Sequence, residues 1–199
     1  MSQVVDELLI EEAKHDPEAF GELVLRYQDR LYNFLYRMTG NAQDAEDLAQ
    51  EVFLRIYKAL DRFRPDAPFR PWMYKIAVNT AINHIKGRKP VTVLEDYIPS
   101  RSMDDCPEEM AETREAQRLI TKSILELPEA YRAIVLLRHI DDLPYDEIAH
   151  ALDLPLGTVK VRLHRARALL QSKLLAAGIK NVGDHELQRS NETTAPLSR

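Results

Sequence analysis

Apolar side chains recur at helical spacing along most of this chain, and no other feature constrains the fold as much. After the pair Asp16-Pro17, which suits the N-cap and first turn of a helix, they repeat every three or four residues up to Gly40. The same pattern predicts further helices over about 42–63, 72–86, 108–126, 129–140, 145–152 and 158–176. No stretch shows a convincing strand-like alternation. The sequence therefore predicts an all-α protein.

Two interruptions divide the predicted helices. The segment RFRPDAPFRP, residues 62–71, holds three prolines and cannot continue a helix. A second interruption, residues 90–107, contains repeated turn-type residues and no sustained period, which is typical of a linker. We therefore expect two small helical domains joined by an acidic flexible linker, the second a helix-turn-helix domain followed by a disordered tail. The expected boundaries are 1–89, 90–107, 108–177 and 178–199.

The charge is distributed unevenly along the chain, whose net charge is -5. Residues 90–115 carry eight acidic and two basic side chains, a net -6, which leaves +1 for the remainder. The segments 70–90 and 158–173 contain basic residues and no acidic one. Two cationic segments on either side of an acidic connector indicate two domains that both approach an anion.

Several function classes are disfavoured because their signatures are missing. The start of the chain lacks the basic leader and long apolar run of a signal peptide, so we expect a cytoplasmic protein without membrane insertion. Cys106 is the single cysteine, and no Cys or His pairs have zinc-ligand spacing. Gly-rich phosphate loops and the motifs HExxH and GxSxG are absent. We expect no catalytic residues, no metal and no cofactor, and therefore not an enzyme.

The segment YDEIAHALDLPLGTVKVRLHRA, residues 145–166, has the helix-turn-helix pattern: a short helix, a tight turn containing Gly157 and a longer helix. At about 100° per residue, one face of the longer helix is apolar and predicted to be buried: Val159, Leu163, Ala166 and Leu170. The residues predicted to reach duplex DNA are Thr158, Lys160, Val161, His164, Arg165 and Arg167. A plain solvated helix is the alternative interpretation.

The segment 63–89 combines aromatic, amide and cationic side chains, a mixture that suits single-stranded DNA. Unpaired bases stack on aromatic rings for about 1–3 kcal/mol each, cations follow the phosphates, and amides read exposed base edges. The candidate contacts are Phe63, Arg64, Phe69, Trp72, Lys75, Asn79, Asn83, Lys86 and Arg88. For Trp72, Tyr74 and Ile76 the alternative is a structural role in the core of a three-helix domain.

Four segments in this order resemble the extracytoplasmic-function sigma factors of bacterial RNA polymerase, and the resemblance covers about residues 10–177. They are DAEDLAQEVFLRIYKAL, FRPDAPFRPWMYKIAVNTAINHIKGRK, ELPEAYRAIVLLRHIDDLPYDEIAHAL and PLGTVKVRLHRARALL. The resemblance implies a protein that binds core polymerase and starts transcription of a stress or envelope-response regulon. It also implies that the N-terminal domain recognises and melts the minus-ten promoter element, and that the C-terminal domain recognises the minus-thirty-five element.

The resemblance further assigns partners and a docking surface. The first of the four segments would dock on the coiled-coil of the largest polymerase subunit, through Asp44, Asp47, Leu48, Gln50, Glu51 and Leu54. The alternative is that these carboxylates only solvate the helix and favour its N-terminal end. The flap of the second-largest subunit and an anti-sigma factor are the other implied protein partners. The loop 64–70, with Phe63 and Asn79, would hold a flipped base of the minus-ten element.

Two other classes of protein remain as alternatives. A stand-alone helix-turn-helix transcriptional regulator would bind duplex DNA as a dimer without polymerase, but the aromatic and amide-rich segment 63–83 disfavours it. An adaptor that binds a regulator through its helices would leave both basic segments unexplained. Run-off transcription with core polymerase discriminates between these alternatives and the sigma factor.

Overall fold

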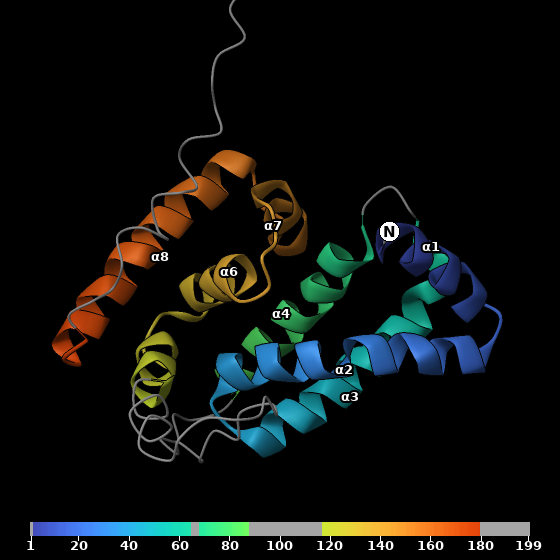
Figure 1. The fold of residues 1–199 in the computed structure, drawn as a ribbon, viewed down its shortest axis with the longest axis horizontal. Coiled ribbons are helices and arrows are strands. Elements are labelled where there is room, and N and C mark those ends of the chain that lie inside the picture. The colour runs from blue at the N-terminus through green and yellow to red at the C-terminus, as the bar shows by residue number, and fades with distance from the viewer. Residues whose placement is uncertain (1, 65–67, 88–116, 180–199) are drawn as a thin grey trace, which may run out of the picture.

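The computed structural model describes residues 2–64, 68–87 and 117–179, and all regular secondary structure within them is helical (Figure 1). The N-terminal half, residues 2–87, contains α1 (Ser2–Ala13), α2 (Pro17–Thr39), α3 (Ala42–Ala59), the 3-10 turn η1 (Leu60–Arg62) and α4 (Phe69–Gly87). The C-terminal half, residues 117–179, contains a helical segment at 117–125, then α6 (Glu129–His139), α7 (Tyr145–Leu152) and α8 (Leu156–Ala176). The prediction of an all-α fold is confirmed.

The ends of α2 follow the local chemistry of the sequence. The Asp16 carboxylate accepts a hydrogen bond from the Glu18 N–H at 2.9 Å, and Pro17 occupies the first helical position, where a missing N–H costs nothing. At the other end Gly40 has φ +75°, a left-handed conformation that favours glycine, and its N–H donates to the Tyr36 carbonyl at 2.7 Å. Both predicted helix ends are confirmed.

Several boundaries differ from the sequence-based expectation. No helix was expected before Asp16, yet α1 covers residues 2–13. Helix α4 begins at Phe69 rather than at residue 72, because Pro71 lies in the first turn, where no intrahelical N–H is required. The tight turn before α8 is made by Asp153, which has φ +55°, whereas Gly157 lies inside the first turn of α8. The predicted range of α7 is confirmed.

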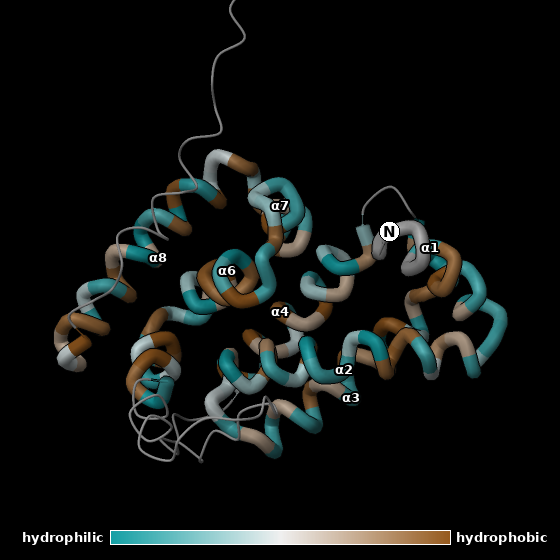
Figure 2. Tube along the Cα trace, in the orientation of Figure 1, coloured by the Kyte–Doolittle hydropathy of each residue, from teal (hydrophilic) through white to brown (hydrophobic). Residues whose placement is uncertain are grey.

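Helices α2, α3 and α4 pack on one another, and α1 packs against α2 (Figure 1). Hydrophobic and hydrophilic residues both occur along these helices, as expected for amphipathic elements (Figure 2). The buried apolar residues of α2 and α3 include Leu23, Tyr27, Leu31, Phe34, Leu35, Ala45, Leu48, Val52 and Ile56. The bundle leaves one side of α3 and part of α4 in contact with solvent.

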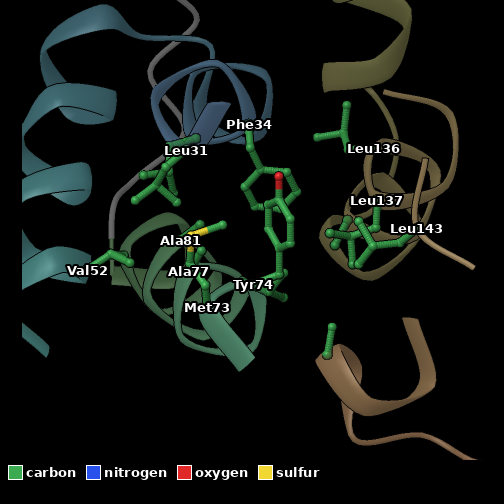
Figure 3. Close-up of a cluster of buried hydrophobic side chains, with 14 of the residues drawn as sticks. Leu31, Phe34, Val52, Met73, Tyr74, Ala77, Ala81, Leu136, Leu137 and Leu143 are labelled. Atoms are coloured by element: carbon green, nitrogen blue, oxygen red, sulfur yellow. The ribbon is translucent and has the colours of Figure 1, made fainter. Parts of the chain in front are cut away.

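Helix α6 is enclosed by its neighbours. Six consecutive residues, 132–137, are buried, so the helix has no solvent-facing side over that stretch. It packs against α7 and α8 within the C-terminal half and against α2 of the N-terminal half. The buried apolar residues of the two halves form one continuous core. In Figure 3, Leu136, Leu137 and Leu143 of the C-terminal half face Phe34 and Tyr74 of the N-terminal half.

Some predictions fall on residues that the structure does not describe. The predicted linker 90–107, the start of the helix expected at 108–126 and most of the tail lie outside the described residues, as do Arg88 and Cys106. Within the described ranges, no helix is both long and apolar enough to cross a membrane.

Candidate nucleic-acid interface

The faces of α8 are arranged as its sequence predicts. Val159, Leu163 and Ala166 are buried against the rest of the C-terminal half. The residues exposed on the outward side are Lys160, Val161, His164 and Arg165. Val161 is 51% exposed, so the outward side of α8 includes an apolar side chain among the cations. This outward surface, the α8 stripe, has the cations and short side chains that suit a helix lying in the major groove.

Arg167 lies apart from the α8 stripe, because its side chain turns towards α6. Its Nε donates a hydrogen bond to His139 Nε2 at 3.2 Å, and the pair is partly buried. Burial, followed by the nearby Arg167 and Arg138 guanidinium groups, lowers the pKa of His139 to about 4. His139 is therefore neutral near pH 7 and accepts from Arg167, which fixes α8 on α6. A phosphate contact by Arg167 stays a prediction.

Three aromatic residues predicted to contact DNA form a packed cluster where η1 meets α4. Phe63 and Phe69 are buried, and Trp72 is half-buried. The Phe63–Trp72 ring centroids lie 4.9 Å apart, and the Phe69 ring lies 5.8 Å from Phe63 and 5.7 Å from Trp72. This geometry supports the structural interpretation of Trp72, and it extends that interpretation to both phenylalanines. Stacking of bases on Phe63 or Phe69 stays a prediction, and both rings would first have to become exposed.

The polar residues predicted on α4 do reach solvent. Asn79, Asn83 and Lys86 are exposed and follow one another at spacings of four and three residues, so they share one face of the helix. We refer to these three residues as the α4 stripe. Arg64 is also exposed. Lys75 lies four residues before Asn79 on the same face of α4, but its ammonium group is 3.4 Å from the carboxylate of Asp153, the residue that ends α7.

Only part of the predicted docking surface on α3 is exposed. Asp47, Gln50 and Leu54 are exposed at spacings of three and four residues and form the α3 stripe, with Glu51 half-buried beside it. The expectation that Asp44 and Leu48 belong to this surface is wrong. Leu48 is a core residue. Asp44 is only 6% exposed, because it lies in the first turn of α3 with its carboxylate 3.3 Å from His84 Nε2 of α4.

Tyr57 belongs next to the α3 stripe, although the sequence analysis did not select it. It lies three residues after Leu54, its side chain is 49% exposed, and its ring contacts Phe20 edge-on at 4.9 Å. An aromatic residue at helical spacing from an exposed leucine was the signal that would have found it.

Comparisons with known proteins match each half of the chain to a separate family. The Sigma-70 region 2 family matches residues 23–90, and the Sigma-70 region 4 family matches residues 117–170. ECF RNA polymerase sigma factor SigW of Bacillus subtilis (strain 168) is 36% identical over 184 residues, which cover 87% of this chain and 98% of SigW. The chain belongs to the ECF sigma factors of RNA polymerase. The ECF RNA polymerase sigma-E factor of Escherichia coli (strain K12) is 37% identical to this sigma factor over 183 residues, 86% of this chain and 95% of the relative.

Two solved structures resemble this sigma factor over most of its chain. CnrH, solved in complex with the cytosolic domain of CnrY, matches with a TM-score of 0.67 and 27% identity, over 86% of this chain and 97% of CnrH. The sigma factor RpoE of Bartonella quintana, solved in complex with the anti-sigma factor NepR, matches with a TM-score of 0.63 over 78% of this chain and 96% of RpoE. RpoE and this chain are 20% identical, so this match shows a shared fold. The family predicted from the sequence is confirmed.

Proposed function

We propose that this sigma factor uses the α4 stripe and the α8 stripe to read two promoter elements at once. The α4 stripe would bind the unpaired strand of the minus-ten element, and the α8 stripe would read the minus-thirty-five duplex. The observation that carries this assignment is that both halves present exposed polar and cationic side chains outside the shared core. Amides without neighbouring acids suit base edges, and exposed cations suit phosphates.

The α3 stripe supplies the contact with core polymerase in this proposal. Asp47, Gln50 and Leu54 combine one charged, one amide and one apolar group, and Leu54 is 59% exposed. Such a surface suits a basic coiled-coil that carries apolar residues between its charges. We assign the coiled-coil of the largest subunit to the α3 stripe and the flap of the second-largest subunit to the C-terminal half.

The proposed domains are residues 1–89 and 108–177. These ranges include both family matches except position 90.

An anti-sigma factor is the proposed regulator, because RpoE of Bartonella quintana was solved with one bound and shares this fold. The stand-alone regulator is disfavoured by the Sigma-70 region 2 match over residues 23–90. The transcribed genes in this proposal are a stress or envelope-response regulon.

Run-off transcription with purified core polymerase, with and without the full chain, tests the proposal on a library of promoters. Transcripts that require the protein support it, and their absence from every promoter contradicts it. Asn79→Ala should weaken binding of holoenzyme to a premelted minus-ten element and leave the upstream duplex contact unchanged. Gln28→Ala, which removes an exposed amide from α2, is the matched control. Equal effects of the two substitutions would remove Asn79 from the interface.

A further inference from the structure

Val161 is the one apolar member of the α8 stripe. Its side chain is 51% exposed, and the other members of the stripe are Lys160, His164 and Arg165. Isolated apolar side chains are common on protein surfaces, so exposure alone assigns no role to this valine. Its place among side chains that we propose contact DNA, however, restricts what it can touch.

The charge of α8 indicates which kind of partner can cover Val161. Residues 156–176 include five Lys and Arg residues and no acidic one. An apolar protein surface laid over Val161 would bury the charges of Lys160 and Arg165 without acidic partners, which is costly. The phosphates of a nucleic acid compensate these charges instead. The group that meets Val161 should therefore belong to DNA.

The edges of the bases offer one apolar group in the major groove. Every base pair presents hydrogen-bond donors or acceptors there, and only thymine adds a methyl group, at C5 of the pyrimidine ring. A valine side chain can neither donate nor accept a hydrogen bond, so against any other edge it would leave polar groups without partners. 5-Methylcytosine carries its methyl group on the same ring carbon. The pyrimidine 5-methyl group is thus the feature that fits Val161.

The position of Val161 along α8 suits contact with a base. It lies five residues after Leu156, the first residue of α8, and the N-terminal part of a recognition helix is the part that contacts base edges. Arg165 follows on the same face about 6 Å further along the helix, which is less than two base-pair steps of about 3.4 Å. Valine also has one strongly preferred rotamer in a helix, so fixing its methyl groups costs little entropy. The contacted pyrimidine should therefore lie close to the base pair that Arg165 faces.

We propose that Val161 reads the 5-methyl group of one pyrimidine in the minus-thirty-five duplex, and that this pyrimidine can be thymine or 5-methylcytosine. The inference rests on the proposed function of the α8 stripe and names the chemical group that one of its residues recognises. It has a regulatory consequence. At a promoter that holds cytosine in this position, methylation at C5 supplies the missing contact and strengthens recognition.

The first experiment removes the methyl group from the DNA. Holoenzyme assembled with the full chain selects upstream duplexes from a randomised library, and each thymine of the best-bound duplex is then replaced singly by deoxyuridine, which lacks only the methyl group. At one thymine this replacement should weaken binding about fourfold, the value of one buried methyl group. The proposal is refuted if binding is unchanged at every thymine.

The second experiment removes the methyl groups from the protein. Val161→Ala changes an exposed position, so the variant should fold, bind the thymine duplex about fourfold more weakly and no longer distinguish thymine from deoxyuridine. Leu175→Ala, which shortens a 53% exposed side chain about 21 Å further along α8, is the matched control and should keep the full deoxyuridine effect. An equal deoxyuridine effect in the wild type and in Val161→Ala would assign the methyl group to another contact and overturn the proposal.

The third experiment separates the two sources of the methyl group. At the sensitive position the thymine pair is replaced by a cytosine–guanine pair, with and without a methyl group at C5. The wild type should bind the methylated duplex about fourfold more tightly, whereas Val161→Ala should bind both alike. Equal binding by the wild type would overturn the recognition of 5-methylcytosine and its regulatory consequence. Failure to select any upstream sequence would contradict the proposed function itself, while a selected sequence that is insensitive to every methyl group contradicts only the role of Val161.

Discussion

Lowering the pH from 7 to 5 should loosen the attachment of α8 to α6, through His139. Burial and two nearby arginines depress the pKa of this imidazole from 6.5 to about 4, so the folded protein binds the proton less readily than the unfolded chain does. The associated stability is fully present above pH 6.5, where His139 is neutral in both states. It is lost as the pH falls from 6.5 towards 4, because the unfolded chain gains a proton first.

The size of the effect follows from the two pKa values. The full interval between 6.5 and about 4 corresponds to about 3 kcal/mol of unfolding free energy, of which about 2 kcal/mol is lost by pH 5. His139 is only partly buried, and solvent screens part of its interaction with Arg167. We therefore expect a loss of about 1 kcal/mol between pH 7 and pH 5 from this residue.

Urea denaturation followed by far-ultraviolet circular dichroism, at both pH values, measures this loss. His139→Gln keeps an acceptor for the Arg167 Nε–H but cannot take up a proton. Between pH 7 and pH 5 its free energy of unfolding should therefore fall by about 1 kcal/mol less than that of the wild type. His150→Gln, at an exposed position of α7, is the control and should behave like the wild type. If His139→Gln loses as much stability as the wild type, the neutral, buried state assigned to His139 is wrong.

Three further outcomes test other parts of the structure. Gly40→Ala should cost at least about 1–2 kcal/mol in thermal denaturation, because an L-residue is strained at φ +75° and its Cβ would meet Leu125. Asp47→Arg combined with Leu54→Ala should weaken co-purification with core polymerase about tenfold while circular dichroism stays unchanged, and undiminished co-purification would remove the α3 docking assignment. Arg165→Ala should cost about 1–3 kcal/mol at one or two base pairs of the minus-thirty-five element in holoenzyme binding, and a uniform loss across sequences would make it a phosphate contact instead.

Much of the fold could be predicted because helical periodicity and capping are local. The Asp16-Pro17 start and the Gly40 end of α2 depend on neighbouring residues alone, and both were predicted. The same holds for the buried side of α8, where spacing alone separates Val159 and Leu163 from the outward residues. Helix α1 was missed although it carries the same local signal, since Val5, Leu9 and Ala13 recur at four-residue spacing.

The side-chain contacts that the sequence did not predict involve partners that are distant in sequence. Asp44 has the position of a solvated acid near a helix N-terminus, and only the fold brings His84 beside it. Arg167 belongs to a cationic run, yet its partner His139 lies 28 residues earlier on another helix. The Tyr74 hydroxyl donates to the carboxylate of Asp141, 67 residues away. Periodicity identifies which side of a helix is buried, but it carries no information about which distant residue lies there.

The enclosure of α6 limits how freely the two halves can be exchanged between proteins. Residues 132–137 are buried on every side, and part of that cover comes from α2 of the N-terminal half. A chimera that joins the C-terminal half of this chain to the N-terminal half of another sigma factor would have to reproduce the surface around Met38 and Phe34. Without it, apolar side chains of α6 would face water and the hybrid would tend to aggregate. Helix α8, which we propose reads DNA, can therefore be transplanted most safely together with α6 and with α2, which covers part of α6.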